Sequence, residues 1–326
     1  RQLLAALRAE GHDALAVPLA GLHPLPDAVA RNAAATAFAT CPAEATMLID
    51  GLALPAFEAL GDALVARRAA ALVHHPTALE PGHDEADHAR LREIEHRLLP
   101  RLARVVVTSD SMAQLLIDAF GVEPTRLAVV VPGVGPARRS RGSGGPACRI
   151  LSLGALTPRK GHDVLLRALA RLFDLPWHLT LVGTADRHPA HATALRLLAE
   201  ELGVAAQVSF AGVLDDAMLE TVWERTDLFA LATHWEASSW AAMQALRHGV
   251  PAVVANGGAA ACGLTPENGI VVPAGDAELL SRALRRAIFD TQLRAALAEA
   301  AWETGRALPD WPRQARHLAA LLARSS

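Results

Sequence analysis

The chain lacks three features that would place it in other classes of protein. It contains no uninterrupted run of about 18 apolar residues, which argues against a membrane-spanning helix. Its net charge is only −3 at pH 7, which argues against a general nucleic-acid binder. Its three cysteines, Cys41, Cys148 and Cys262, lie far apart and form no Cys-x-x-Cys or Cys/His metal spacing. This usage favours a reducing cytoplasm as the location.

What the chain does contain is enough apolar sequence for two α/β domains: 326 residues, of which 52% are hydrophobic. It opens on Arg1 and runs directly into a helix pattern that Gly11 ends. An α/β domain normally supplies a strand first. We therefore expect a first strand and the turn after it ahead of Arg1, together with any ligand contacts that this turn makes.

Apolar runs alternate with helix patterns through the first part of the chain. These runs are solid rather than alternating, which is typical of strands in a parallel sheet covered on both faces. The expected strands are 14–18, 46–49, 70–73, 105–108 and 127–131, with helices over 54–67 and 111–120 and a charged, mostly helical segment over 80–103.

Residues 132–147 break this rhythm. They are dense in Gly, Pro, Ser and Arg without apolar periodicity, and we interpret them as an interdomain linker. A second series follows, with strands 149–153, 179–182, 207–210, 228–232 and 270–272 and helices 161–173, 190–202, 217–225 and 239–248. The sequence thus predicts two doubly wound, Rossmann-like domains that face each other across a cleft, the usual place for a ligand.

The turn that opens the second domain carries positive charge next to a helix start. It holds Gly154, Arg159 and Lys160 between a strand and an amphipathic helix, where the two cations could neutralise a diphosphate. Lys160 is the only lysine of the chain, so a compact, flexible ammonium is indicated at this position. The alternative is that both cations are solvated turn residues.

The stretch 227–256 predicts a strand, a turn with Glu236, a helix and a second strand. Ser238 or Ser239 could cap the helix, and Gly249 stands where a left-handed residue ends one. The helix N-terminus and Glu236 would then lie at the carboxyl edge of a parallel sheet. This geometry suits a phosphate-bearing ligand whose hydroxyls face the acid.

A series of motifs in the second domain resembles the donor domain of the retaining family 4 glycosyltransferases. The motifs are GALTPRKGHDVLLRAL, LTLVG, VSFAGVLDD, DLFALAT, Glu236, HGVPAVV and GIVVPAGDAELLSRAL, with a weaker match in the first domain through DGLALPAFE, ALVHHP, RVVVTS and LAVVVPGV. The resemblance implies the two-Rossmann GT-B fold and transfer of a sugar from a nucleotide-diphosphate donor, with retention and with neither metal nor cofactor.

The resemblance also sets the domain limits. It implies an acceptor domain over 1–135, a linker over 136–147, a donor domain over 148–308 and, in 309–326, a C-terminal helix that crosses back to the first domain. The acceptor, whether a glycan, a lipid or a small molecule, is left open. Peripheral contact with a membrane also stays open, although no strongly basic amphipathic face stands out.

Residue roles follow from the same resemblance. Glu236 would hold donor-sugar hydroxyls and act in catalysis with Lys160 and His75. The donor and its phosphates would be bound by Gly154, Arg159, Lys160, Ser238, Ser239, Trp240 and Gln244. Asp50 and His74, each at a strand end, are candidates on the acceptor side, where the alternative for His74 and His75 is that they only end their strand.

This chain departs from the family pattern at several donor positions. Gln244 stands where the family usually has a second Glu on the ribose, which weakens that contact by roughly 1–2 kcal/mol. Ala155 replaces a common Arg, and side chains replace glycines at Ala237, Ser238 and Ser239, which the bulky Trp240 follows. Two alternatives therefore stand beside the transferase: a catalytically impaired binding or partner protein, and a GT-B-type nucleotide-sugar epimerase.

A metal site is an alternative interpretation of one segment of the first domain. His75, His83, Asp84, Asp87 and His88 lie close together in sequence, but their spacing is irregular. A solvated helix start explains them better than a metal site.

Overall fold

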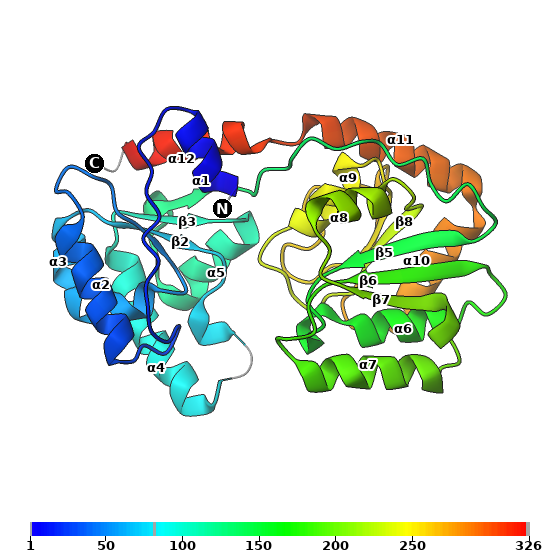
Figure 1. Cartoon of the computed structure of the whole chain (residues 1–326), viewed down its shortest axis with the longest axis horizontal. Helices are drawn as coiled ribbons and strands as arrows, with labels where there is room; N and C mark the ends of the chain where they lie inside the picture. Colours follow the sequence, from blue (N-terminus) through cyan, green and yellow to red (C-terminus); the bar gives the residue numbers. More distant parts are fainter. Residues whose placement is uncertain (1, 81–82, 324–326) are drawn as a thin grey trace. The chain divides into compact units, whose positions relative to one another are not determined.

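The computed structural model describes residues 2–80 and 83–323, which form two compact units. Unit 1 contains residues 1–133 together with 310–326, and unit 2 contains residues 134–309. Each unit has its own parallel sheet flanked by helices (Figure 1). The predicted fold class of two parallel-sheet α/β domains is confirmed.

Unit 1 is built on a four-stranded parallel sheet of order β1-β2-β3-β4. Buried valines and alanines fill the central strands, as expected for a sheet covered on both faces. The strands are β1 (Leu48–Asp50), β2 (Ala70–Val73), β3 (Arg104–Val107) and β4 (Leu127–Val129). The α-helices are α1 (Gln2–Ala9), α2 (Ala28–Thr40), α3 (Gly61–Ala66), α4 (Glu85–Leu98), α5 (Asp110–Phe120) and α12 (Trp311–Ala323). α12 packs against α1 (Figure 1).

Short 3-10 helices complete unit 1: η1 (Leu54–Leu60), η2 (Thr77–Leu79), η3 (Leu99–Arg101) and η4 (Pro124–Arg126). One expectation for this unit was wrong. Residues 14–18 form no strand, and this apolar run is not buried in the sheet, since Leu15 and Val17 are 79% and 57% exposed. Residues 28–40 form α2, whose start is capped by the Asp27 carboxylate accepting from the Ala30 amide at 2.7 Å.

A buried carboxylate anchors the turn that follows β2. Glu95 of α4 is 2% exposed and accepts three hydrogen bonds, from the Thr77 amide at 2.7 Å, the Thr77 hydroxyl at 2.9 Å and the Ala78 amide at 3.1 Å. Burial raises the pKa of Glu95, and the hydrogen bonds and nearby His75 oppose that shift. The bonds satisfy η2 amides that would otherwise be buried without partners.

Unit 2 is built on a six-stranded parallel sheet of order β10-β9-β8-β5-β6-β7. Its strands are β5 (Cys148–Leu153), β6 (Trp177–Val182), β7 (Val208–Gly212), β8 (Leu228–Leu231), β9 (Ala252–Ala255) and β10 (Gly269–Val272). Its α-helices are α6 (His162–Ala170), α7 (Pro189–Glu201), α8 (Asp216–Trp223), α9 (Trp240–Arg247), α10 (Ala277–Phe289) and α11 (Thr291–Ala307), with 3-10 helices η5 (Pro158–Lys160) and η6 (Ala205–Gln207).

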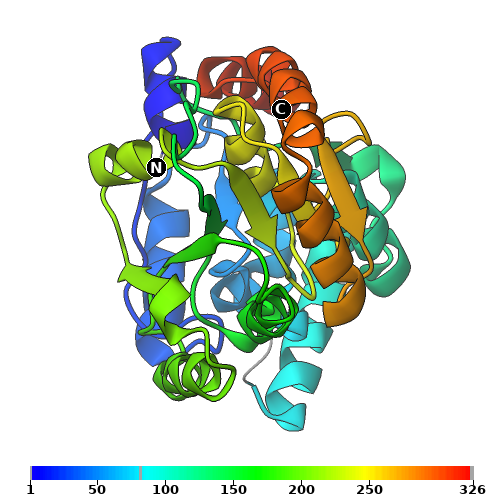
Figure 2. The same ribbon diagram turned by 90° about the vertical axis from the view of Figure 1, so that its right-hand side faces the viewer.

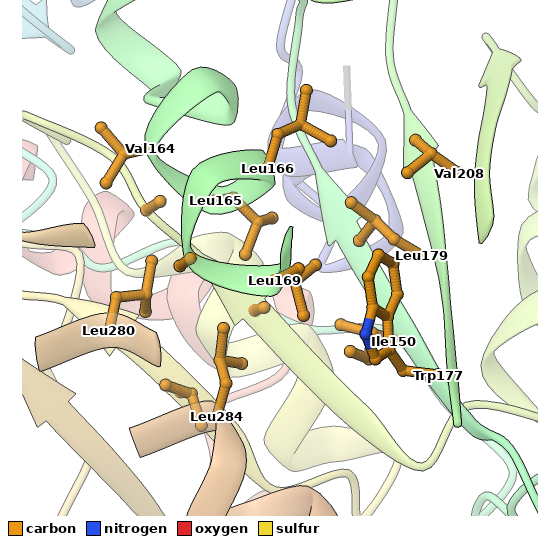
Figure 3. Close-up of a cluster of buried hydrophobic side chains, with 14 of the residues drawn as sticks. Ile150, Val164, Leu165, Leu166, Leu169, Trp177, Leu179, Val208, Leu280 and Leu284 are labelled. Carbon is orange, nitrogen blue, oxygen red and sulfur yellow. The ribbon is translucent and has the colours of Figure 1, made fainter. Parts of the chain in front are cut away.

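Both faces of this sheet are covered (Figure 2). Ile150 belongs to a core formed with α6, α7 and α10, whereas the next residue, Leu151, belongs to a second core formed with α8 and α9. In the larger core, Leu165 and Leu169 of α6 lie among residues of β5, β6 and α10 (Figure 3). This two-sided burial is the physical reason for the solid apolar runs in the sequence.

The Gly- and Arg-rich segment before β5 has no helix or strand over residues 136–147, yet it is bonded to unit 2. The Ser140 amide donates to the His248 carbonyl at 2.8 Å, and its hydroxyl donates to the Thr226 carbonyl at 2.7 Å. Further along, the Ser143 amide donates to Asp227 at 2.9 Å. The segment is therefore fixed on the surface of unit 2.

His162 begins α6 and is buried, with 1% of its surface exposed. Burial lowers its pKa from the ordinary value of 6.5 to about 3, and the charges of Lys160 and His191 lower it further. The imidazole is therefore neutral in the folded protein at neutral pH.

We predict that Glu95→Ala lowers the free energy of unfolding by about 2–4 kcal/mol, because it leaves buried amides without an acceptor. Glu93→Ala is the matched control, since Glu93 lies on the same helix with its side chain 65% exposed. The control should cost less than about 0.5 kcal/mol. Urea denaturation followed by circular dichroism measures both, and equal effects of the two variants would contradict the anchoring role.

We predict a second effect, on the pH dependence of stability. Below pH 6.5 the unfolded chain binds a proton at His162, whereas the folded chain does so only near pH 3. The free energy of unfolding therefore falls as the pH falls through this window. Between pH 7 and pH 4.5, the free energy of unfolding of the His162→Leu variant should fall by about 2–3 kcal/mol less than that of the parent chain. Urea denaturation followed by tryptophan fluorescence at the two pH values tests this, and identical pH profiles would refute it.

Candidate functional site

The candidate site lies at the carboxyl ends of β5 and β8 in unit 2. These strands are neighbours in the sheet, but the chain leaves β5 toward β6 and leaves β8 toward β9, on opposite sides. Such a switch point is the place where open α/β sheets bind ligands. Two loops meet there: residues 154–161 after β5 and residues 232–239 after β8.

Two cations from the first loop converge on one carboxylate from the second. The Lys160 Nζ forms an ion pair with the Glu236 Oε1, and an Arg159 guanidinium nitrogen lies 3.2 Å from the Glu236 Oε2. The Lys160 and Glu236 side chains are 13% and 12% exposed, and that of Arg159 is 30% exposed. The structure thus brings together three predicted site residues, the adjacent Arg159 and Lys160 and, 76 positions after Lys160, Glu236.

Thr233, which sequence reasoning missed, stands beside this cluster. Its buried hydroxyl lies 3.1 Å from the Glu236 Oε1 and 3.0 Å from the carbonyl oxygens of Arg159 and Trp235, and it donates to one of them at a time. An Arg159 guanidinium nitrogen also donates to the Trp235 carbonyl at 2.5 Å. Its position two residues after β8 is the one sequence signal that could have identified it.

Glycines allow the two loops to approach closely. A Cβ on Gly161, whose φ is +61°, would lie 2.1 Å from the Ala232 carbonyl oxygen. A Cβ on Gly154 would lie 2.8 Å from the Lys160 Cε, so the lysine stem runs directly over this predicted site glycine. At position 161 only glycine permits this contact between the loops.

Gly257 and Gly258, in the loop after β9, lie against the backbone of Glu236. The Glu236 amide donates to the Gly257 carbonyl at 3.1 Å, and the Ala259 amide donates to the Glu236 carbonyl at 2.8 Å. A Cβ on Gly258 would lie 2.4 Å from that carbonyl oxygen. Sequence reasoning did not select Gly257 and Gly258, although a Gly-Gly pair that a single residue separates from a strand at this sheet edge is a recognisable signal.

The helix α9 starts beside Glu236, but not in the predicted way. Ser239 is its N-cap residue and makes no side-chain capping bond, so the predicted Ser239 cap is wrong: its backbone, at φ −83° and ψ 14°, is not the extended conformation that capping requires. Ser238 immediately precedes the cap residue, Trp240 is the first helical residue, and Gln244 is half-buried one turn further. Gly249 has a φ of +65°, as predicted for a helix end.

The predicted residues of unit 1 lie at the ends of its strands. Asp50 ends β1 and accepts a hydrogen bond from the Leu52 amide at 2.9 Å. His74 and His75 follow β2, with His74 exposed and His75 paired with Glu80 at 3.1 Å.

The histidine-rich segment around α4 is a helix start. The Asp84 carboxylate caps α4 by accepting from the Asp87 amide at 2.8 Å, and the His88 Nδ1 lies 2.8 Å from the Ala78 carbonyl. Over residues 2–80 and 83–323, no three His, Cys, Asp or Glu side chains are grouped as a metal site requires. Within the same ranges no helix is both long enough and apolar enough to cross a bilayer.

Solved structures share this fold at low sequence identity. Sucrose-phosphate synthase from Thermosynechococcus elongatus matches with a TM-score of 0.80 and 20% identity, over 99% of this chain and 92% of its own. The Anabaena protein HepE, in complex with UDP and glucose, matches with a TM-score of 0.76 and 22% identity, over 90% of this chain and 81% of its own. These likenesses confirm the expected GT-B fold.

Curated relatives match part of the chain. D-inositol 3-phosphate glycosyltransferase from Acidothermus cellulolyticus is 30% identical over 61% of this chain and 48% of its own length, and that of Salinispora arenicola is 31% identical over 64% and 52%. The chain thus spans about half the length of these relatives.

Two family models match the chain in succession. The model described as Glycosyltransferase Family 4 matches residues 55–138. The model described as Glycosyl transferases group 1 matches residues 137–304, which is more than half of the chain and includes the whole cluster around Glu236. The chain therefore belongs to the group 1 glycosyltransferases, as its resemblance to family 4 indicated.

Proposed function

We propose that the protein transfers a sugar from a nucleotide-diphosphate donor to an acceptor, with retention of configuration and without a metal ion. The observation that carries this proposal is the convergence of Lys160, Arg159 and Glu236 at the switch point of unit 2. Two cations beside one acid suit a ligand with an anionic diphosphate and a neutral, hydroxyl-rich sugar.

The two cations would stabilise the leaving group. Negative charge grows on the diphosphate as the glycosidic bond breaks, and positive groups already in place lower that barrier. Lys160 supplies a compact ammonium that is mostly buried, and Arg159 supplies a planar guanidinium. The backbone amides in the first turn of α9 would add further positive potential. Gly154, which has no side chain, would let the donor come close to the backbone of the first loop. Together these groups provide the positive charge that a metal ion otherwise supplies.

Glu236 would change partners when the donor binds. In the structure its carboxylate neutralises Lys160 and Arg159. The diphosphate would take over these cations, and the carboxylate would then accept hydrogen bonds from the sugar hydroxyls. Its backbone bonds to Gly257 and Ala259 keep it in place during this exchange.

Unit 1 is proposed to bind the acceptor. His75 is the proposed catalytic residue of this unit, and Asp50 and His74 are the further candidates at strand ends. UDP-glucose is the first donor to test, because HepE was solved in complex with it. D-inositol 3-phosphate is the first acceptor to test, because the relatives are named for it. A cytoplasmic location remains a prediction. The acceptor is a glycan, a lipid or a small molecule, and all three classes are to be tested.

A second candidate is a nucleotide-binding protein that has lost catalysis. It is favoured by Ala155 and Gln244, which supply less charge to a donor than the family residues do, and by the side chains of Ala237 and Ser239 where the family has glycines. An epimerase is a third candidate and would turn over the donor with no acceptor present. Donor turnover with and without an acceptor separates the three.

We predict opposite effects of two substitutions on UDP binding. Lys160→Ala removes a phosphate partner and should weaken UDP binding by about 10–100-fold, with a parallel loss of transfer. Glu236→Gln frees Lys160 for phosphate and should leave UDP binding equal or tighter, while transfer falls by at least about 100-fold. Calorimetry and a radiolabelled-sugar assay measure the two quantities.

Arg167→Ala on the exposed face of α6 and Glu201→Gln on α7 are the matched controls and should behave as the parent chain. Full transfer activity in both site variants would refute the site assignment. Absence of UDP binding at millimolar concentration in the parent chain would refute the nucleotide-sugar proposal itself.

We further predict that Gln244→Glu tightens UDP binding by about 5–30-fold, because a carboxylate accepts ribose hydrogen bonds more strongly than an amide does. Calorimetry with inorganic diphosphate is the control, since this ligand has no ribose and should show no gain. An equal gain for both ligands, or none for UDP, would show that Gln244 does not face the ribose.

A further inference from the structure

The hydroxyl of Thr233 has three acceptors within reach but only one proton to donate. It lies 3.0 Å from the Arg159 carbonyl oxygen, 3.0 Å from the Trp235 carbonyl oxygen and 3.1 Å from the Glu236 Oε1. Thr233 is buried, and its branched side chain is stiff, so the oxygen stays in place while its hydrogen rotates toward the strongest acceptor. The bonding of Thr233 can therefore change without any movement of the chain.

The two backbone carbonyls do not depend on this proton. The Arg159 carbonyl also accepts from the His234 amide at 2.9 Å, and the Trp235 carbonyl also accepts from an Arg159 guanidinium nitrogen at 2.5 Å. Because each carbonyl has a second donor, neither is left unsatisfied when the hydroxyl turns away from it. Thr233 is thus able to give its hydrogen bond to Glu236.

Glu236 is the acceptor whose need for this bond would change. In the structure its Oε1 is paired with the Lys160 Nζ. In the proposed function the diphosphate takes Lys160 away, and the Oε1 then has no cation. A carboxylate that is only 12% exposed is costly to leave without a donor, and a charged acceptor binds a hydroxyl more strongly than a neutral carbonyl does. Thr233 is already within hydrogen-bond distance of this oxygen.

We propose that Thr233 is a positioning residue for the donor sugar. When Lys160 leaves Glu236 for the diphosphate, the Thr233 hydroxyl turns from a backbone carbonyl to the Glu236 Oε1 and holds the carboxylate by that oxygen. The Oε2, which faces Arg159 at 3.2 Å in the structure, is then available to the sugar hydroxyls. This inference rests on the proposed function, and it assigns to an uncharged residue the task of fixing Glu236 while its partners change.

The first test needs no ligand, because Lys160→Ala removes the cation from the Oε1 as the diphosphate would. Urea denaturation of Thr233→Val, Glu236→Ala and the double variant measures their coupling as the part of the midpoint shift that is not additive. We expect this coupling shift to be at least about twice as large in the Lys160→Ala background as in the parent chain, since the hydroxyl then serves Glu236. Equal shifts in both backgrounds, or none, would overturn the proposal. Glu236→Gln replaces Glu236→Ala if the latter does not fold.

The second test compares UDP with UDP-glucose by calorimetry. With UDP alone the Glu236 carboxylate can be hydrated and needs no fixed orientation, whereas a bound sugar requires one. Thr233→Val should therefore keep the affinity for UDP within about twofold of the parent value and weaken that for UDP-glucose by about 5–30-fold. Thr233→Ser retains the hydroxyl and should recover most of the affinity for UDP-glucose.

Thr226→Val is the matched control. Thr226 is also buried, and its hydroxyl donates to the Val222 carbonyl at 2.8 Å, ahead of β8 and at the opposite end of that strand from the site. This variant should change neither affinity. If Thr233→Val weakened UDP and UDP-glucose by the same factor, Thr233 would have a structural role only and the proposal would be wrong. If the parent chain bound neither ligand, the proposed function would fail, and the ligand-free coupling would still decide whether Thr233 holds Glu236.

Discussion

The ion cluster of Glu236, Lys160 and Arg159 depends on one constraint, the adjacency of β5 and β8 in a parallel sheet. Because parallel strands end at the same edge, the loops that follow them meet even though 76 residues separate Lys160 from Glu236. Gly161 permits the final approach, since any side chain there would collide with the Ala232 carbonyl. The packing of the backbone therefore brings the charged residues together, and their side chains pair as a consequence.

In the proposed function, this arrangement would also account for a composite ligand. A mostly buried carboxylate that faces two cations is neutralised as long as it keeps them. A simple anion that bound the two cations, but had no hydrogen-bond donor for Glu236, would leave this carboxylate unpaired and close to negative charge. A nucleotide sugar offers phosphate to the cations and hydroxyls to the acid, so every group keeps a partner. In the proposed function this exchange is the basis of donor selectivity.

Much of the fold could be predicted because a parallel sheet imposes a simple pattern. The apolar run at 70–73 coincides with β2, and Gly249 takes the left-handed conformation expected after a helix. The sequence-based predictions failed where strand pairing or local backbone geometry determines the structure. The run at 14–18 has strand composition but pairs with no strand of the described residues, and Ser239 has the capping residue type but not the capping backbone.

The sequence by itself determined the class of the fold, the order of its elements and the identity of the charged residues at strand ends, because these depend on local periodicity and on the matched family pattern. Only the tertiary structure decided which of those residues meet. Thr233 carries no charge and no motif, and its contact with the Arg159 carbonyl exists only once β5 and β8 lie side by side. The contact between Gly257 and the Glu236 amide likewise requires β8 and β9 to be neighbours. Such contacts depend on the packing of strands distant in sequence, which no local pattern records.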